Sequence, residues 1–203
     1  MPELEKIYYD KGYRVIAGID EAGRGPLAGP VCAAAVILPE GMIIEGVDDS
    51  KKLSEKKREL IYDRIVEAAI AYSVAFVWPD VIDEINIRRA THKAMQKAAD
   101  GLKVKPELLL VDGNDGLPFD GFESDYIIKG DSKLECIAAA SIIAKVTRDR
   151  YMREIDKEYP DYGFAKHKGY GTKAHMEAIR EVGLCPIHRK TFITDKVLGR
   201  EHK

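Results

Sequence analysis

Four acidic residues share a position that could serve chemistry, because each stands beside a turn, directly after a short apolar segment. They are Asp20, Glu21, Asp112 and Asp131. In an α/β sheet, side chains at strand ends gather at the edge where binding and catalytic sites are built. Carboxylates gathered at one edge repel one another, so a bound cation is needed to keep them ionised. Hard oxygen ligands suit Mg²⁺ or Mn²⁺, which also take phosphate oxygens from a substrate, so the pattern indicates a divalent-cation site that handles phosphates.

The same residues also have an ordinary structural reading, because Asp is common in turns. Asp20 and Glu21 raise a geometric point as well, since successive strand residues point to opposite faces of a sheet. Both can serve one site only where the strand ends or twists, and the glycines that follow them permit this.

A glycine-rich segment, 23–29, follows the first acidic pair. It differs from the dinucleotide-binding fingerprint, because its last glycine comes one position late and a strand-like run follows in place of a helix. Glycines let backbone N–H and C=O groups approach a ligand, and Arg24 between them can reach a phosphate. The segment therefore predicts a tight turn that also contacts a ligand.

Other familiar sites lack their motifs in this sequence. Cys185 and His188 form half of a zinc site without a second half, and neither a P-loop nor a serine-nucleophile elbow is present. Together with Cys32 and Cys136, the third cysteine forms no disulfide framework, which favours a reducing compartment.

The formal net charge of −2 hides an uneven distribution. Residues 1–128 carry more acidic than basic side chains, and residues 129–203 carry more basic than acidic ones. Either ordinary surface variation or a face that binds a polyanion explains this asymmetry, and charge alone does not separate the two.

The elements that must position these residues alternate along the chain. Short apolar runs predict strands at 15–19, 31–38, 73–78, 107–111 and 126–128, and the first two are expected to pair antiparallel. Helices are predicted from Ser54 to about 71, from Pro79 to Gly101, from a Ser132–Glu135 capping box to Pro160, and from Thr172 to Gly183. This order predicts a mixed α/β sheet covered by helices on both faces.

Length and composition bound the class of protein. The 203 residues are 45% hydrophobic and 33% charged, which excludes a disordered tail and favours a single domain over 1–203. The longest apolar run, 31–38, is much shorter than the ~18 residues of a membrane span, and no signal-peptide pattern opens the chain. The sequence predicts a soluble cytoplasmic protein that does not associate with membranes.

A series of segments resembles one protein family in order. The segment AGIDEAGRGP, 17–26, resembles the opening signature of ribonuclease HII, the type 2 ribonuclease H. Later segments resemble further blocks of that family: DSKKL (49–53), VDG (111–113), KGDSK (129–133), AASIIAKVTRDR (139–150), HKGYGT (167–172) and IHRKTF (187–192). The resemblance spans residue 14 to about 193, which is nearly the whole chain.

The resemblance implies a ribonuclease H-like fold, with a mixed five-stranded sheet flanked by helices. It also implies a helical C-terminal extension over about 160–203 that forms part of the substrate cleft. The catalytic and metal-binding residues that it implies are Asp20, Glu21, Asp112 and Asp131, with Mg²⁺ or Mn²⁺ as cofactor and two ions when substrate is bound. The substrate-binding residues are expected to be Gly23, Arg24, Gly25 and Tyr170, with Lys51, Lys133 and Lys168 holding flanking phosphates.

The implied activity is endonucleolytic hydrolysis of the RNA strand of RNA–DNA hybrids, and cleavage 5′ of single ribonucleotides embedded in duplex DNA. The products would carry 3′-hydroxyl and 5′-phosphate ends, and the expected roles are ribonucleotide excision repair and DNA replication. We expect a monomer, with the C-terminal tail as a candidate contact for a replication clamp. Two alternatives stay open: another nuclease of the same fold, such as a junction resolvase, and a non-catalytic module that binds hybrids.

Overall fold

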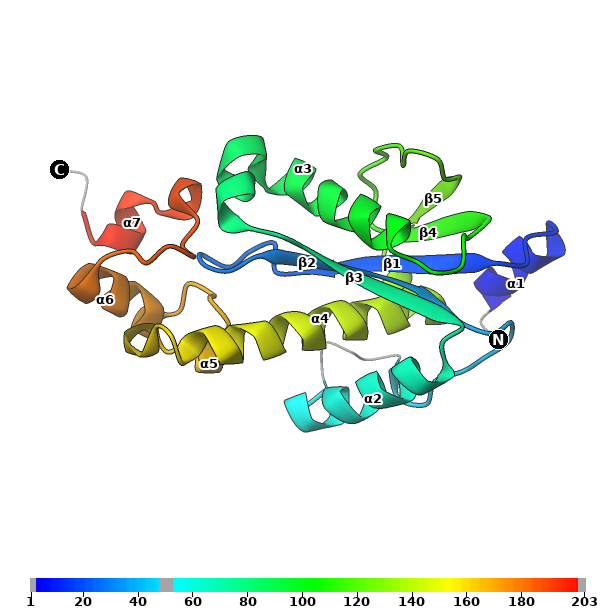
Figure 1. Ribbon diagram of the computed structural model, residues 1–203, viewed down its shortest axis with the longest axis horizontal. Coiled ribbons are helices and arrows are strands. Elements are labelled where there is room, and N and C mark those ends of the chain that lie inside the picture. The colour runs from blue at the N-terminus through cyan, green and yellow to red at the C-terminus, as the bar shows by residue number, and fades with distance from the viewer. Residues whose placement is uncertain (1–2, 48–52, 201–203) are drawn as a thin grey trace.

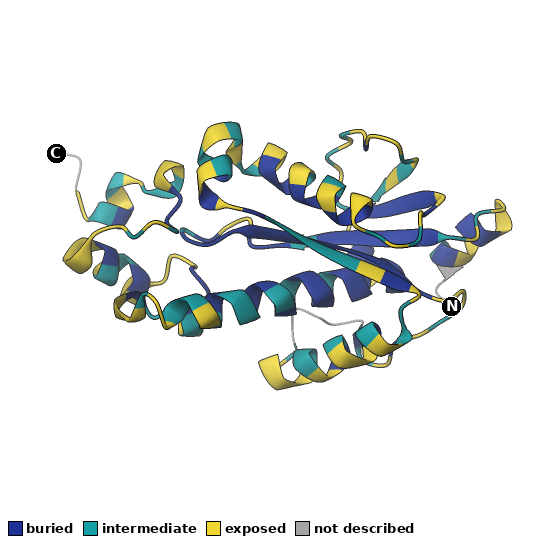
Figure 2. Ribbon diagram, in the orientation of Figure 1, coloured by how far each residue is buried: buried dark blue, intermediate teal, exposed yellow. Residues whose placement is uncertain are grey.

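The central sheet is built around a strand whose seven residues are all buried. This strand, β2 (Val31–Ile37), consists of small and medium apolar side chains, and three consecutive alanines occupy its middle. Its odd-numbered residues pack into the core on one face and its even-numbered residues into the core on the other. Figure 2 shows the residues at the centre of the sheet coloured as buried. Small side chains on both faces let helices approach the sheet closely.

The computed structural model describes residues 3–47 and 53–200. Its sheet has five strands in the order β3-β2-β1-β4-β5, as seen in Figure 1. The other strands are β1 (Ile16–Ala22), β3 (Ala71–Val77), β4 (Leu108–Asp112) and β5 (Ser124–Ile127). Strands β1, β2 and β3 pair antiparallel, whereas β4 runs parallel to β1 and to β5. The predicted mixed sheet flanked by helices is confirmed.

Two long helices cover the two faces of the sheet. Helix α3 (Pro79–Asp100) packs on one face and α4 (Glu135–Asp156) on the other, with α2 (Glu55–Ala68) outside α4 (Figure 1). A short helix, α1 (Glu3–Asp10), precedes β1 and was not predicted. A Cβ added to Gly18 would lie 2.2 Å from the backbone carbon of Cys136, so the start of α4 lies directly against β1.

Several helix ends agree with the sequence prediction. Ser54 caps α2 by accepting a hydrogen bond from the N–H of Lys57, and Gly101 follows the last residue of α3. The predicted capping box at the start of α4 is wrong, because this helix begins at Glu135. Ser132 donates to the carbonyl of Lys129 over 2.9 Å, while the Glu135 carboxylate accepts the N–H of Ile44 over 3.4 Å. Ser132 thus bonds backward to its own turn, and Glu135 contacts a segment distant in the chain, so neither forms the predicted cap.

The first strand is longer than predicted. The apolar run ends at Ile19, but β1 continues through Ala22 because β2 pairs with it over that whole length, up to Ala22 opposite Cys32. Asp20 and Glu21 therefore lie inside β1, and the prediction that they end the strand is wrong.

The last part of the chain forms short helices beside the end of α4. These are α5 (Phe164–His167), α6 (Lys173–Val182), which Thr172 caps as predicted, and α7 (Asp195–Leu198). They surround a small core of their own that includes Phe164 and Ile179. Figure 1 shows them at the end of the sheet where β1 turns into β2. Within the described ranges, no helix is long and apolar enough to cross a membrane.

Candidate active site

Two aspartates meet where the parallel strands β1 and β4 stop pairing. The last paired residues are Ile19 and Val111, and Asp20 and Asp112 come directly after them. Side chains alternate along a strand, so both aspartates lie on the sheet face covered by α4. The parallel pairing thus brings together two carboxylates that are 92 positions apart in the sequence.

Asp20 is the most buried of the clustered carboxylates. It is 6% exposed, and one of its carboxylate oxygens accepts the N–H of Glu21 over 2.7 Å. Burial raises the pKa of Asp20 well above its usual range, and the neighbouring carboxylates of Glu21 and Asp112 raise it further. Groups that oppose one another's ionisation in this way are the kind that a cation would stabilise.

Glu21 reaches the same site from the opposite face of the sheet. Because β4 ends at Asp112, no neighbouring strand separates the two faces beyond that point. The Glu21 carboxylate lies 3.3 Å from the guanidinium of Arg24. Burial raises the pKa of Glu21, Arg24 lowers it, and Asp112 raises it again. Asp20 and Glu21 can therefore serve one site because the neighbouring strand β4 ends beside them, and not because β1 ends there.

Asp131 lies beside this group, in a single 3-10 turn over Gly130–Ser132. It is 9% exposed, and the N–H of the preceding Gly130 donates to Asp112 over 2.6 Å. This bond ties the turn to the end of β4. The pocket described next is lined by Asp20, Glu21 and Asp112, and Asp131 is not among its lining residues.

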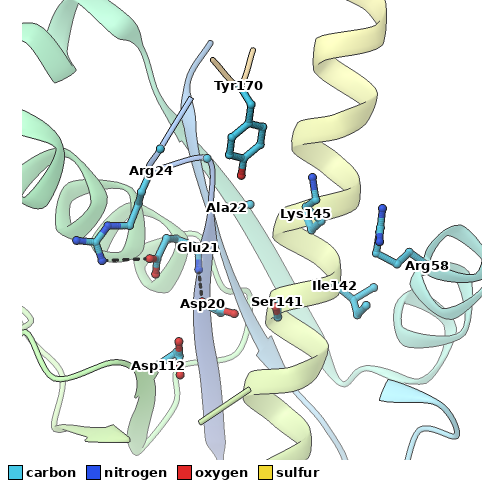
Figure 3. Close-up of a pocket in the computed structure, with 12 residues that line it drawn as sticks. Asp20, Glu21, Ala22, Arg24, Arg58, Asp112, Ser141, Ile142, Lys145 and Tyr170 are labelled. Carbon is cyan, nitrogen blue, oxygen red and sulfur yellow. Dashed lines mark hydrogen bonds and ion pairs between the residues drawn. The ribbon is translucent and has the colours of Figure 1, made fainter. Parts of the chain in front are cut away.

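A pocket of about 390 Å³ opens over the three clustered carboxylates. Figure 3 shows Asp20, Glu21 and Asp112 on one side of it and the side chains of Lys145 and Arg58 on the other. Lys145 pairs with Asp149 one turn along α4 over 2.7 Å, and burial lowers its pKa. An acidic wall that faces a basic one can hold cations and phosphates side by side. Sequence reasoning missed Ser141, Lys145 and Arg58 as lining residues.

The glycine-rich turn and Tyr170 form the upper part of the pocket. Gly23, Arg24, Gly25 and Tyr170 all line it, and a Cβ on Gly25 would lie 3.8 Å from the tyrosine ring. Tyr170 is 43% exposed, and its hydroxyl points into the pocket in Figure 3. The structure therefore brings Tyr170 together with Gly23, Arg24 and Gly25, the residues that were predicted to bind substrate.

Backbone contacts hold the Tyr170 loop against the glycine-rich turn. The N–H of Leu27 donates to the carbonyl of Gly169 over 2.8 Å. Gly169 has φ +84°, and a Cβ there would lie 2.4 Å from the carbonyl oxygen of Ala28. Only glycine combines this backbone conformation with so close an approach.

Two buried arginines support the turn from below, and sequence reasoning gave neither a role. Arg148 of α4 donates to the carbonyls of Pro30, Ala28 and Lys168. Arg189, near the C-terminus, donates to the carbonyls of Gly29, Arg24 and Gly23. Both arginines lie in segments that carry the family resemblance, which was the available signal, but no local pattern predicts partners so far away in the chain.

The three lysines predicted to hold phosphates have different settings. Lys133 is exposed and directly follows the turn that carries Asp131. Lys168 is 8% exposed, and its ammonium group contacts the carbonyl of Ala165 and lies 3.6 Å from the Glu55 carboxylate. A phosphate contact by Lys168 therefore requires its ammonium to leave both partners. Lys51 lies outside the described residues.

The donor set fits a divalent metal ion. Buried and half-buried carboxylates supply hard oxygen ligands, and the raised pKa of Asp20 reflects first its burial and then the negative charge of Glu21 and Asp112. Within residues 3–47 and 53–200, no three His, Cys, Asp or Glu side chains already stand close enough to hold an ion by themselves. Mg²⁺ usually retains several waters and binds through one or two carboxylates together with substrate phosphates, so a preformed cage is not required.

Comparison with known proteins finds relatives that share more than half of their aligned residues with this chain. A ribonuclease HII from Acetivibrio thermocellus is 58% identical over 93% of this chain and 73% of its own length. A ribonuclease HII from Caldicellulosiruptor bescii is 56% identical over 94% of this chain and 92% of its own length.

Solved structures agree in fold. Ribonuclease H2 from Pyrococcus horikoshii OT3 superposes with a TM-score of 0.78 at 31% identity, covering 92% of this chain and 98% of that one. Ribonuclease HII from Archaeoglobus fulgidus, solved in a complex with PCNA, gives 0.77 at 30%, covering 89% of this chain and 96% of that one. Bst-RNase HIII, solved with Mn²⁺, gives 0.63 at 20%, covering 86% of this chain and 65% of that one, and shows the fold alone. The family model for ribonuclease HII matches residues 17–195, and the chain belongs to this family.

Proposed function

We propose that this protein is an endonuclease that hydrolyses the RNA strand of RNA–DNA hybrids and cuts 5′ of single ribonucleotides embedded in duplex DNA. One observation carries the proposal: the carboxylates of Asp20, Glu21 and Asp112 line the same pocket as the glycine-rich turn and Tyr170. A group that can hydrolyse a phosphodiester and a group that can contact a sugar thus lie within reach of one nucleotide.

The acidic residues have the role of holding divalent ions. Asp20 is the central ligand in this proposal, with Glu21, Asp112 and Asp131 completing the set. When bound, two Mg²⁺ or Mn²⁺ ions would supply an activated water and stabilise the leaving oxygen. The basic side of the pocket, with Lys145 and Arg58, holds the scissile strand opposite the carboxylates. The expected products carry 3′-hydroxyl and 5′-phosphate ends.

Recognition of RNA depends on the 2′-hydroxyl, the group that distinguishes it locally from DNA. The backbone of Gly23 and Gly25 and the hydroxyl of Tyr170 are the polar groups proposed to contact it. The ring of Tyr170 is proposed to stack on the sugar of the next nucleotide, where a deoxyribose fits better than a ribose. Flanking phosphates are assigned to Arg24, Lys133 and Lys168, and also to Lys51 beyond the described residues.

The cellular setting follows from this activity. We infer a monomeric cytoplasmic enzyme that acts in ribonucleotide excision repair and replication. Contact between its C-terminal tail and a replication clamp stays a prediction, supported by the PCNA complex of the Archaeoglobus fulgidus relative.

One assay tests the proposed function. The protein is incubated with a DNA duplex that contains a single ribonucleotide, with an RNA–DNA hybrid, with an all-DNA duplex and with a four-way DNA junction. Each substrate is tested with Mg²⁺, Mn²⁺ or EDTA. We expect cleavage of the first two only, and only with metal. Cleavage of the junction alone would indicate a resolvase, and binding without any cleavage would indicate a hybrid-binding module.

A further inference from the structure

Arg189 is a fully buried arginine whose hydrogen-bond partners in the described chain are all backbone carbonyls. It is 0% exposed, and its three nitrogens donate to Gly29 over 2.9 Å, to Arg24 over 2.8 Å and to Gly23 over 2.6 Å. The planar guanidinium presents its donors in a fixed fork, so these three contacts fix the direction of the carbonyls that they bind.

The direction of these carbonyls determines where the backbone N–H groups of the turn point. Every peptide bond in the described ranges is trans, and in a trans peptide the N–H points away from the preceding C=O. The carbonyls of Gly23 and Arg24 point inward to Arg189, so the N–H groups of Arg24 and Gly25 point outward. Gly23, Arg24 and Gly25 line the pocket, so these two donors face the space that a substrate would occupy.

A second guanidinium lies under the same turn. Arg148 is 1% exposed and also donates to three carbonyls, and a Cβ added to Gly23 would lie 2.1 Å from its Nε. Burial, together with the positive charge of Arg148, lowers the pKa of Arg189 to about 9. Tyr170 and Asp83 oppose this shift of the Arg189 pKa. Two buried cations behind a turn whose N–H groups face outward make that turn attractive to an electronegative ligand.

We propose that Arg189 is the positioning residue for recognition of RNA: it holds the N–H groups of Arg24 and Gly25 toward a ribose or phosphate oxygen of the substrate. This inference rests on the proposed function and adds a residue to it. Arg189 is too deeply buried to touch a substrate, so it acts through the turn. A purely structural arginine would only anchor the C-terminal segment, and its loss would weaken all kinds of binding alike.

The test compares Arg189→Lys with Arg180→Lys. Arg180 also donates to backbone carbonyls of the C-terminal segments, those of Val197 and Lys196, which lie outside the pocket. Both variants keep the positive charge and lose carbonyl contacts, but only Arg189→Lys loses the contacts to Gly23 and Arg24. Affinity for an RNA–DNA hybrid and for an all-DNA duplex is measured in EDTA, well below the melting temperature of the less stable variant. We expect Arg189→Lys to lower the ratio of the two affinities about tenfold, through weaker hybrid binding, and Arg180→Lys to leave that ratio within about threefold of wild type. In cleavage with Mg²⁺, the loss in Arg189→Lys should lie mainly in KM for the ribonucleotide-containing duplex.

Equal losses of affinity for hybrid and DNA in Arg189→Lys would overturn the inference. If Arg189→Lys does not fold, the same affinity ratio is measured for Asp83→Ala. The Asp83 carboxylate accepts the N–H groups of Lys190 and Thr191, so it stabilises the segment that carries Arg189. A lower hybrid preference in Asp83→Ala supports the inference, and an unchanged preference overturns it. A wild-type protein that cleaves neither substrate would refute the proposed function itself, which is a separate result.

Discussion

The guanidinium of Arg189 lies 2.6 Å from the carbonyl oxygen of Gly23, although the two residues are 166 positions apart in the chain. Nearby, the N–H of Leu27 donates to Gly169 and the N–H of Gly29 donates to Ile187. The turn after β1 is therefore bound on several sides by segments from the last part of the chain. The C-terminal segments are a structural part of the pocket.

Replacing Asp20 by Asn separates catalysis from stability. Cleavage with Mg²⁺ should fall at least about a hundredfold, because the neutral amide is a poor ligand for a divalent ion. The melting temperature without metal should stay equal to or rise above that of wild type. The raised pKa of Asp20 means that its ionised form opposes folding once the pH exceeds the ordinary value of 3.8, so removing the charge relieves that cost at neutral pH.

Asp83→Asn is the matched control for this prediction. The pKa of Asp83 is lowered by hydrogen bonds from Thr191 and Lys190 that outweigh its partial burial, so its charge favours the folded state at neutral pH. This variant should melt below wild type. Wild-type turnover in Asp20→Asn would remove Asp20 from the metal site.

Tyr170→Ala should lose most of the activity on a DNA duplex with one ribonucleotide, and Tyr170→Phe part of it. The ring is 43% exposed, so neither change should move the melting temperature much. Tyr72→Ala is the control, because this tyrosine of β3 is 39% exposed and lies outside the pocket. Normal cleavage by Tyr170→Ala would leave recognition to the glycine-rich turn alone.

The salt dependence of duplex binding should distinguish the roles of Lys133 and Lys168. Affinity for duplex should fall with log[salt] at a slope of about −0.9 per phosphate contact. Lys133→Ala should flatten this slope by about one unit, because the exposed ammonium is free to reach the backbone. Lys168→Ala should flatten it less and lower the melting temperature, since its ammonium already contacts Ala165 and Glu55. A full unit of flattening in Lys168→Ala would show that this lysine leaves both partners when substrate binds.

His175 should make the folded protein sensitive to mild acid. Its Nδ1 lies 3.0 Å from the Tyr170 carbonyl and must donate to it, so Nε2 accepts from His188, also over 3.0 Å. A second proton on His175 would face the N–H of His188. The pKa of His175 is lowered from 6.5 to about 4, mainly by burial; the Tyr170 carbonyl opposes this shift, and the neighbouring His167 and His188 contribute to it.

The sign of the effect follows from proton binding in the two states. Between pH 6.5 and about 4 the unfolded chain binds a proton at His175 that the folded chain does not, so the free energy of unfolding decreases as the pH falls. Thermal melts from pH 7 to pH 4.5 should show this decline in wild type. His175→Asn should melt lower at pH 7 but decline less steeply. Parallel curves for the two proteins would contradict the prediction.

Much of the fold could be predicted because its signals are local. The apolar run of β2, the cap at Ser54 and the glycine after α3 depend on neighbours in the sequence. The acidic residues could be singled out for the same reason, since each stands beside a recognisable strand end or turn.

The rest depends on partners distant in the chain. β1 extends through Asp20 because β2 continues to pair with it, and no pattern within β1 contains that information. The Ser132–Glu135 box does not form: α4 begins at Glu135, and the Glu135 carboxylate accepts the N–H of Ile44, 91 positions away. The burial of Arg189 could not be predicted from neighbouring residues in the sequence. Arginine is seldom fully buried, and the carbonyl acceptors of Arg189 lie 160 or more positions away in the chain.

The distance in sequence between the two halves of the pocket has a consequence for synthesis on the ribosome. Chains are made from the N-terminus, and their early parts can fold before the rest exists. A nascent chain that ends within α4 already contains all four acidic residues but lacks Tyr170 and Arg189. Its glycine-rich turn would lack the contacts from Arg189 and from the Tyr170 loop, so the order of synthesis supplies the acidic cluster first and the means to select a substrate last.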